Sequence, residues 1–167
     1  MEHEIVKGNL IIIGGAEDKY GESKILKIVV EIIGRDEAKL VVLTTATEKP
    51  EDVGAEYKKI FMRLGASKVE ILNINTRDEA NSDSNAEVIK NSTGIFMTGG
   101  DQLRITSILG GTKVYYAVQE AYRMGVVIIG TSAGASAMSN TMIVNGSDND
   151  PARKCTLKMA PGLGLLE

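Results

Sequence analysis

Short, mostly apolar runs recur along the chain, and segments with helical periodicity lie between them. The runs are rich in Val, Ile and Leu, and most of them stop at Gly or Thr, which is typical of buried strands in a parallel sheet. The predicted strands span residues 9–13, 39–43, 69–74, 94–98 and 126–129. Because strands and helices alternate, the pattern predicts an α/β fold: a doubly wound, mostly parallel sheet with helices on both faces.

The helices between these strands have recognisable start and stop residues. Ser23 is a favourable N-cap for a helix over residues 24–33. Pro50 opens a second helix with apolar residues at 3.6-residue spacing, and Gly65 ends it. Further helices are predicted over residues 86–90, 103–109, 112–124 and 133–138, with loops over residues 75–85 and from residue 140 onward.

The unusual residues of the chain gather where the predicted strands end. These segments are residues 14–18, 44–45, 99–102 and 130–134. In open α/β sheets, ligands bind at the carboxyl ends of the strands. We therefore expect a single site along this edge of the sheet.

Ser132 lies in the segment Gly130-Thr131-Ser132-Ala133-Gly134, directly after an apolar strand and before an Ala-rich helical stretch. This strand–turn–helix context is the one that a nucleophile elbow requires. In such a turn the serine takes a positive φ, which we attribute to the lack of a Cβ at Gly130 and Gly134. The amide of Ala133 would then point at the oxygen that becomes negative when Ser132 attacks a carbonyl.

The segment Gly99-Gly100-Asp101-Gln102 is expected to complete this site. Its adjacent glycines allow a close approach of the backbone, so a second oxyanion amide is expected there, and Asp101 and Gln102 can hold polar groups of a substrate. An alternative stays open, in which Ser132 is only a helix N-cap in a tight turn that binds phosphate. Gly14-Gly15 lacks the Gly-x-Gly-x-x-Gly spacing of a dinucleotide loop.

Composition narrows the class of protein. A chain of 167 residues with 43% hydrophobic and 25% charged residues is expected to form a single domain, residues 1–167. A net charge of −3 and the absence of Trp disfavour nucleic-acid binding. The single Cys155 fits a reduced, cytoplasmic compartment, and we predict no signal peptide, membrane span, metal site or cofactor.

The residue that would activate Ser132 is missing from the pattern. A serine hydroxyl needs a base within hydrogen-bond reach at neutral pH. The only histidine is His3, which precedes the first predicted strand, and no lysine stands out by its spacing. Neither His3 nor Cys155 is expected to take part in catalysis.

Four segments in order resemble the cyanophycinase family, a group of serine peptidases that includes aspartyl dipeptidases. They are Ile-Gly-Gly-Ala-Glu-Asp-Lys at 13–19, Thr-Gly-Gly-Asp-Gln-Leu-Arg at 98–104, Gly-Thr-Ser-Ala-Gly-Ala at 130–135 and Met-Ala-Pro-Gly-Leu-Gly-Leu-Leu at 159–166. The resemblance covers about the first two-thirds of such a protein. It implies a fold like that of the class I glutamine amidotransferases, in which a cysteine occupies the elbow.

The resemblance also implies an activity. Family members use Ser, His and Glu to hydrolyse cyanophycin, a poly-aspartate with arginine on each β-carboxyl, to β-aspartyl-arginine. By position, Ser132 is the nucleophile, Ala133 and Gly100 supply oxyanion amides, and Gln102 lies beside the substrate. Asp101 and Arg104 belong to the same segment as Gln102, and Glu17 and Asp18 belong to the segment at 13–19. The resemblance gives no role for Arg104, Glu17 or Asp18. A homodimer is expected.

The family histidine belongs to an Asp-Gln-His-Phe segment a few residues beyond the fourth motif. We therefore expect a chain truncated before its C-terminal third and inactive alone. Two other hypotheses stay open: a related α-aspartyl or isoaspartyl dipeptidase, and a non-catalytic α/β module that binds a small anion or nucleotide. The Asp101-Gln102 pair and the match at 159–166 favour the cyanophycinase hypothesis.

Overall fold

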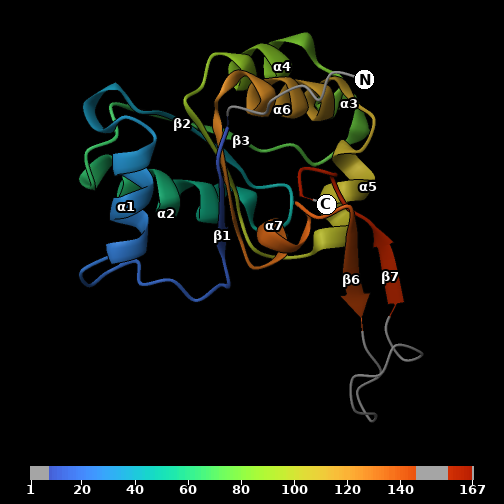
Figure 1. Cartoon of the computed structure of the whole chain (residues 1–167), viewed down its shortest axis with the longest axis horizontal. Helices are drawn as coiled ribbons and strands as arrows, with labels where there is room; N and C mark the ends of the chain where they lie inside the picture. Colours follow the sequence, from blue (N-terminus) through green and yellow to red (C-terminus); the bar gives the residue numbers. More distant parts are fainter. Residues whose placement is uncertain (1–7, 146–157, 167) are drawn as a thin grey trace.

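The strands predicted from the apolar runs pair into one sheet. The computed structural model describes residues 8–145 and 158–166, and its five-stranded sheet has the order β1-β5-β4-β2-β3 (Figure 1). The strands are β1 Leu10–Ile13, β2 Lys39–Leu43, β3 Lys68–Leu72, β4 Gly94–Met97 and β5 Val127–Thr131. All four pairings are parallel, so the carboxyl ends of the strands share one edge. The predicted α/β sheet is confirmed.

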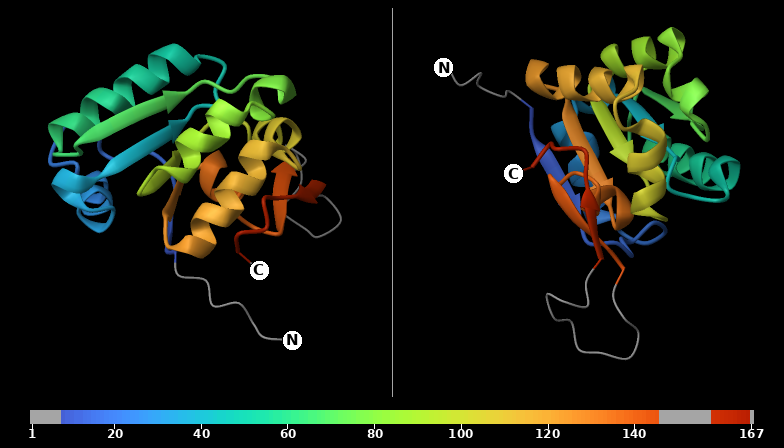
Figure 2. Two further views of the ribbon diagram at one scale, coloured as in Figure 1. Left: turned by 90° about the horizontal axis from the view of Figure 1, so that it is seen from above. Right: turned by 90° about the vertical axis from the view of Figure 1, so that its right-hand side faces the viewer.

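Helices cover both faces of this sheet (Figures 1 and 2). The helices on one face are α1 Lys24–Ile32 and α2 Pro50–Arg63, followed by short connections such as the 3-10 turn η1 Arg35–Glu37. Those on the other face are α4 Asp83–Lys90, α5 Gln102–Leu109, α6 Lys113–Met124 and α7 Ala133–Ser136, with the one-turn helix α3 Arg77–Ala80 beside them.

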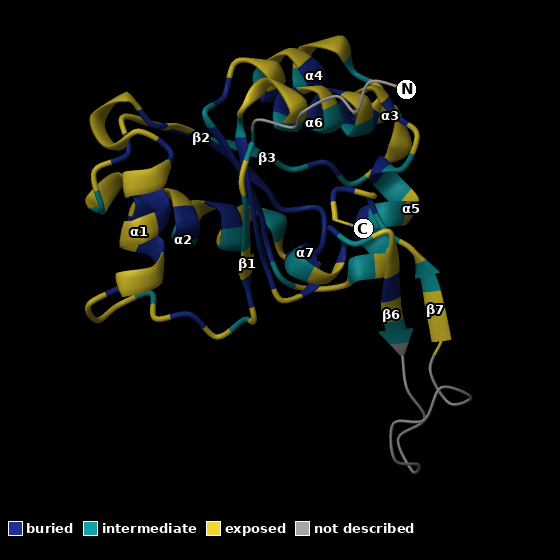
Figure 3. Cartoon of the chain, viewed as in Figure 1, coloured by how far each residue is buried: buried dark blue, intermediate teal, exposed yellow. Residues whose placement is uncertain are grey.

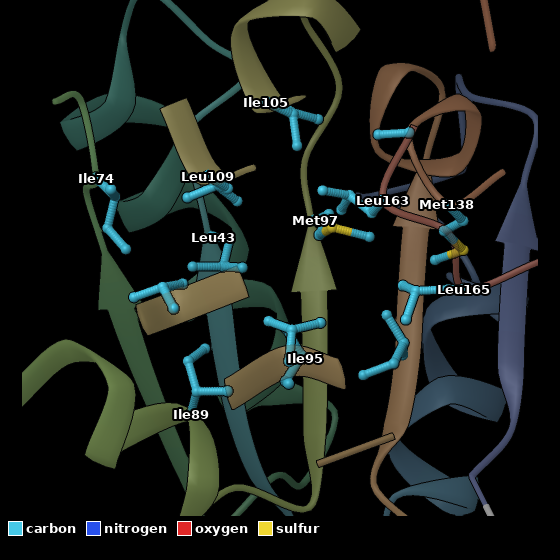
Figure 4. Packing of buried hydrophobic residues seen from close by; sticks show 14 of the residues in the cluster. Leu43, Ile74, Ile89, Ile95, Met97, Ile105, Leu109, Met138, Leu163 and Leu165 are labelled. Carbon is cyan, nitrogen blue, oxygen red and sulfur yellow. The ribbon is translucent and has the colours of Figure 1, made fainter. Parts of the chain in front are cut away.

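Alternation along the strands creates two separate cores. Leu40 and Val42 face α1 and α2, whereas Val41 and Leu43 face the helices on the other side. Figure 4 shows part of the second core, in which strand residues such as Ile95 and Met97 pack under α5 and α7. The sheet is dark blue throughout its centre in Figure 3, as expected for parallel strands buried on both faces.

An aromatic cluster fixes α2 over the sheet. The ring of Phe96 on β4 lies 4.7 Å from that of Tyr57 and 5.2 Å from that of Phe61, centroid to centroid. Contacts of this kind contribute about 1 kcal/mol each beyond the burial of area. Because Tyr57 is held by its ring, its hydroxyl is presented at a fixed place near the carboxyl ends of the strands.

Residues 75–85 correct the predicted loop. Thr76 accepts a hydrogen bond from the amide of Glu79, and the Glu79 carboxylate accepts one from the amide of Thr76, which makes a capping box for α3. Helix α4 then begins at Asp83, three residues before its predicted start, and β3 ends at Leu72, two residues earlier than predicted. The capping box was legible in the sequence as Thr-x-x-Glu, but the polar character of the segment suggested a loop.

Ser23 is not the predicted side-chain cap of α1. Its φ is 49° and its side chain makes no capping hydrogen bond. Its amide instead donates to Oδ2 of Asp18 at 2.9 Å, and its hydroxyl accepts from Arg63 at 3.1 Å. The turn that Asp18 organises therefore sets the start of α1.

The segment after Asn140 is also more ordered than predicted. β6 Thr141–Asn145 and β7 Lys158–Pro161 form an antiparallel pair that projects from the sheet (Figure 1). Beyond β7, Leu163 and Leu165 are buried, and the amide of Leu163 donates to the carbonyl of Ala137 at 2.7 Å. The fourth sequence motif thus packs directly behind α7.

His3 and Cys155 lie outside the described residues, and the predictions about them stay predictions. Over residues 8–145 and 158–166, no helix has the length and apolar character needed to cross a membrane.

Candidate active site

Ser132 occupies a strained turn between β5 and α7. Its φ is 52° and its ψ is −112°, so the predicted positive φ is confirmed. Its amide donates to the carbonyl of Ile13 at 2.9 Å and its carbonyl accepts from the amide of Ser136 at 3.0 Å. Its side chain makes no capping hydrogen bond, which removes the main support for the alternative of a simple N-cap.

The glycines of the Gly-x-Ser-x-Gly pattern serve a different purpose from the predicted one. A Cβ on Gly130 would lie 2.5 Å from the carbonyl oxygen of Gly134, and one on Gly134 would lie 2.3 Å from that of Met97. The two glycines therefore allow β5, α7 and β4 to approach one another by their backbones. The three nearest atoms to a Cβ at either position belong to α7 or to Met97, whereas the two glycines were predicted to be needed for the positive φ of Ser132.

Two other glycines lie against Ser132. A Cβ on Gly15 would be 3.2 Å from the Cβ of Ser132, and one on Gly99 would be 3.4 Å from it. Since β5 lies between β1 and β4, the loops that follow these strands flank the serine from both sides. Gly15 was not predicted to lie beside Ser132, because the order of strands in a sheet does not follow from the sequence pattern.

Ser132 is exposed and lines two hollows. The larger one, about 430 Å³, contains Gln102 and the start of α7, including Ala133 and Ser136. The smaller one, about 250 Å³, is lined by Gly15, Ala16, Glu17, Lys19, Val53, Tyr57, Gly99, Thr131 and Ser132. Ser132 thus borders open space on two sides.

Gln102 and Asp101 are engaged with the protein itself. Nε2 of Gln102 donates to the carbonyl of Ile143 on β6 at 2.8 Å, which fixes the amide group at the rim of the larger hollow. Oδ1 of Asp101 accepts from the amides of Leu103 and Arg104, at 2.8 and 3.3 Å, and so caps α5. The predicted substrate contacts of both residues stay predictions.

Gly100 lies against the loop that follows β2. Its φ is +141°, and a Cβ there would be only 2.1 Å from the carbonyl oxygen of Ala46, which also accepts from the amide of Asp101 at 2.8 Å. Arg104 strengthens this junction, because its Nε donates to the carbonyl of Thr45 at 2.9 Å. Arg104 therefore has a structural role that the sequence did not reveal.

Ala133 begins α7, so its amide has no acceptor within the helix. The residue is buried directly beside Ser132, and it lines the larger hollow. An amide in this position is available to a ligand oxygen at Ser132.

The carboxylate of Glu17 binds the residue that precedes Ser132. It is buried, its Oε2 accepts from the hydroxyl of Thr131 at 2.7 Å, and its Oε1 accepts from the hydroxyl of Tyr57. Burial opposes ionisation, but the hydrogen bonds from Tyr57 and Thr131 outweigh it and hold the pKa of Glu17 below its ordinary value. Burial and the same carboxylate raise the pKa of Tyr57. Tyr57 is thus the donor and Glu17 the anion.

Comparison with known proteins identifies the family. Residues 10–167 match peptidase family S51. The chain belongs to peptidase family S51. As an S51 chain it is 35% identical over 164 residues to a cyanophycinase from Trichormus variabilis, covering 98% of this chain and 55% of the relative. It is 32% identical to a cyanophycinase from Geminocystis herdmanii, covering 98% of this chain and 60% of that one.

The fold agrees with that of a solved peptidase. The crystal structure of a peptidase from an acI-B1 Actinobacterium matches with a TM-score of 0.75 at 23% identity, covering 97% of this S51 chain and 66% of the other. The predicted α/β fold, like that of the class I glutamine amidotransferases, is confirmed. The chain spans about half the length of the curated relatives it matches.

Proposed function

We propose that Ser132 is the nucleophile of a serine exopeptidase that hydrolyses cyanophycin to β-aspartyl-arginine dipeptides. The observation that carries the proposal is the turn at Ser132, which is strained, exposed and joined to a helix whose first amide is free of an intrahelical partner. Membership of family S51 supports the proposed peptide hydrolysis, and the 35% sequence identity to a cyanophycinase supports cyanophycin as the substrate.

In this proposal the reaction proceeds by acyl transfer. A general base takes the proton of the Ser132 hydroxyl as Oγ bonds to the scissile carbonyl carbon, and the amides of Ala133 and Gly100 stabilise the oxyanion. The C–N bond then breaks, and the leaving amine takes the proton from the protonated base. Water hydrolyses the acyl-enzyme by the same sequence and regenerates the serine.

The remaining groups take supporting roles in the proposal. Gln102, fixed at the rim of the larger hollow, contacts the substrate, and Asp101 does so beside it. No histidine occurs among the described residues, and the proposal assigns the general base to none of them. We further infer that the protein is a cytoplasmic homodimer, which acts on the polymer or its dipeptides without nucleic acid, membrane or cofactor. Sedimentation velocity of the purified protein tests whether it is a dimer.

The test is a pair of serine variants in the protein expressed from the complete reading frame. Ser132→Ala is expected to lower the release of β-aspartyl-arginine at least about 10³-fold, because a serine peptidase without its nucleophile retains only binding and oxyanion contributions. Ser136→Ala, which alters the same hollow, is expected to retain activity. Undiminished release by Ser132→Ala would refute the assignment.

Substrate choice and the non-catalytic alternative need separate measurements. Preference for α-aspartyl or isoaspartyl dipeptides over cyanophycin would identify a dipeptidase instead. A fluorophosphonate probe is expected to label the wild-type protein at Ser132. Failure of both labelling and hydrolysis would favour a module that only binds small ligands.

A further inference from the structure

One buried carboxylate, that of Glu17, takes no part in the proposed acyl transfer. Glu17 comes from the loop after β1, yet its two oxygens bind residues of two other elements, Thr131 at the end of β5 and Tyr57 on α2. Thr131 immediately precedes Ser132. Glu17 is therefore one hydrogen bond and one peptide unit away from the proposed nucleophile.

The Ser132 turn needs support of this kind. A non-glycine residue in a sparsely populated backbone conformation costs about 1–3 kcal/mol and persists only when its surroundings hold it there. The backbone amide of Ser132 is held by Ile13, and its carbonyl is held by the amide of Ser136. The residues against its side chain, Gly15 and Gly99, have no side chain with which to hold it. Support through the preceding residue, Thr131, is what the structure offers in addition.

Glu17 itself is held rigidly. The ring of Tyr57 stacks on that of Phe61 in the aromatic cluster, and Nζ of Lys19 lies 4.4 Å from the centre of the Tyr57 ring while it pairs with Glu56 at 2.7 Å. A carboxylate with two hydroxyl donors makes stronger hydrogen bonds than a neutral acceptor does. The connection from α2 to the end of β5 thus runs through side chains with little freedom.

We propose that Glu17 is a positioning residue for Ser132, which holds the serine turn through the hydroxyl of Thr131 while Tyr57 anchors Glu17 to α2. This inference rests on the proposed function, because it assigns Ser132 as the nucleophile. It differs from a direct role. Glu17 also lines the smaller hollow, and contact with a substrate there would affect binding rather than the orientation of Oγ.

Thr131→Val tests the connection, since valine keeps the shape of threonine and replaces its hydroxyl with a methyl group. In the protein from the complete reading frame, we expect kcat and the rate of fluorophosphonate labelling to fall about tenfold or more, because small displacements of a reacting group cost up to about 10²-fold. KM should change less than about twofold, since no interaction common to ground and transition state is lost. Thr131→Ser, which keeps a hydroxyl, should restore kcat to within about twofold.

A buried threonine elsewhere provides the control for mere destabilisation. Thr112 is fully buried and donates to the carbonyl of Leu109 at 2.6 Å at the start of α6. Thr112→Val loses this hydrogen bond and the one that its hydroxyl accepts from the amide of Tyr115, so it should lower the unfolding midpoint and leave kcat unchanged. Equal loss of kcat in Thr112→Val and Thr131→Val would overturn the inference.

Glu17→Gln separates positioning from substrate contact. If both residues act as one unit, Glu17→Gln should add no further loss of kcat in the Thr131→Val background. In the single variant Glu17→Gln, a raised KM with a normal kcat would instead mean direct substrate contact and would overturn the positioning role. A wild-type protein that is neither labelled nor active would refute the proposed function as well, whereas a labelled wild type with unaffected Thr131→Val would refute this inference alone.

Discussion

Two loops flank Ser132, and they are held in place by different physics. The loop after β1 relies on charged side chains, with Glu17 bound to Thr131 and Asp18 accepting from the amide of Gly21 at 2.7 Å. The loop after β4 relies on the absence of a side chain, because Gly100 lies against the carbonyl of Ala46. The loop after β1 should therefore respond to protonation of its carboxylates, and the loop after β4 to a side-chain atom added at Gly100.

Gly100→Ala should have the largest effect on this contrast. A Cβ 2.1 Å from the oxygen of Ala46 must displace backbone, and φ of +141° is strained for alanine, so we expect a loss of about 3 kcal/mol or more in the free energy of unfolding. Urea denaturation measures it. Gly111→Ala is the control, since φ is +70° and no atom lies within 4 Å, and only the backbone cost of about 1 kcal/mol is expected. Equal losses would show that close approach at Gly100 is unimportant.

Asp101 sharpens the comparison, because it is the one carboxylate that organises the loop after β4. Asp101→Ala should cost about 1 kcal/mol of unfolding free energy through the lost cap of α5, and Asp101→Asn should cost much less. Both are measured by urea denaturation, with KM determined in parallel. A raised KM in a fully stable Asp101→Asn protein would indicate a substrate contact beyond the cap.

The smallest expected effect is the acid response of the loop after β1. Because the pKa of Glu17 is lower in the folded than in the unfolded state, its carboxylate stabilises the fold above the unfolded pKa. That contribution is lost as pH falls through the folded pKa. From pH 7 to strongly acidic pH, the wild type should lose more unfolding free energy than Glu17→Gln. Parallel pH profiles for the two proteins would contradict it.

Other carboxylates do not obscure that difference. The pKa of Asp18 is also lowered, first by the amide of Ser23 and then by that of Gly21, but Asp18 is the same in both proteins. Its contribution cancels in the comparison. The difference between the two pH profiles therefore reports on Glu17 in the loop after β1, and not on the loop after β4.

The parallel sheet was predictable from the sequence because each strand is a local pattern. Runs such as residues 39–43 announce burial on both faces without reference to any other part of the chain. Strand order depends on contacts between distant segments. The neighbours of Ser132 therefore could not be predicted from the sequence pattern. The pairing of β6 with β7 was missed for the same reason, since it joins segments on either side of residues 146–157.

The site was predictable where it depends on the chain near Ser132, and not where it depends on contacts between loops. The positive φ follows from the strand–turn–helix sequence. The purpose of Gly130 and Gly134 was predicted wrongly, because their close contacts are with backbone of α7 and β4 rather than with the serine. Glu17 stood in a conspicuous motif, but its partners lie 40 and 114 positions away along the chain.

The strand that supports the proposed nucleophile lies at the margin of the sheet. In the described part of the chain β1 pairs with β5 alone, and its Ile12 is 56% exposed, yet its last carbonyl holds the amide of Ser132. Native proteins open locally as well as globally, and segments with few buried apolar contacts open at the lowest free energy. Opening of β1 would break the hydrogen bond that holds the amide of Ser132, so the geometry of the serine depends on the local stability of these four residues as well as on global stability.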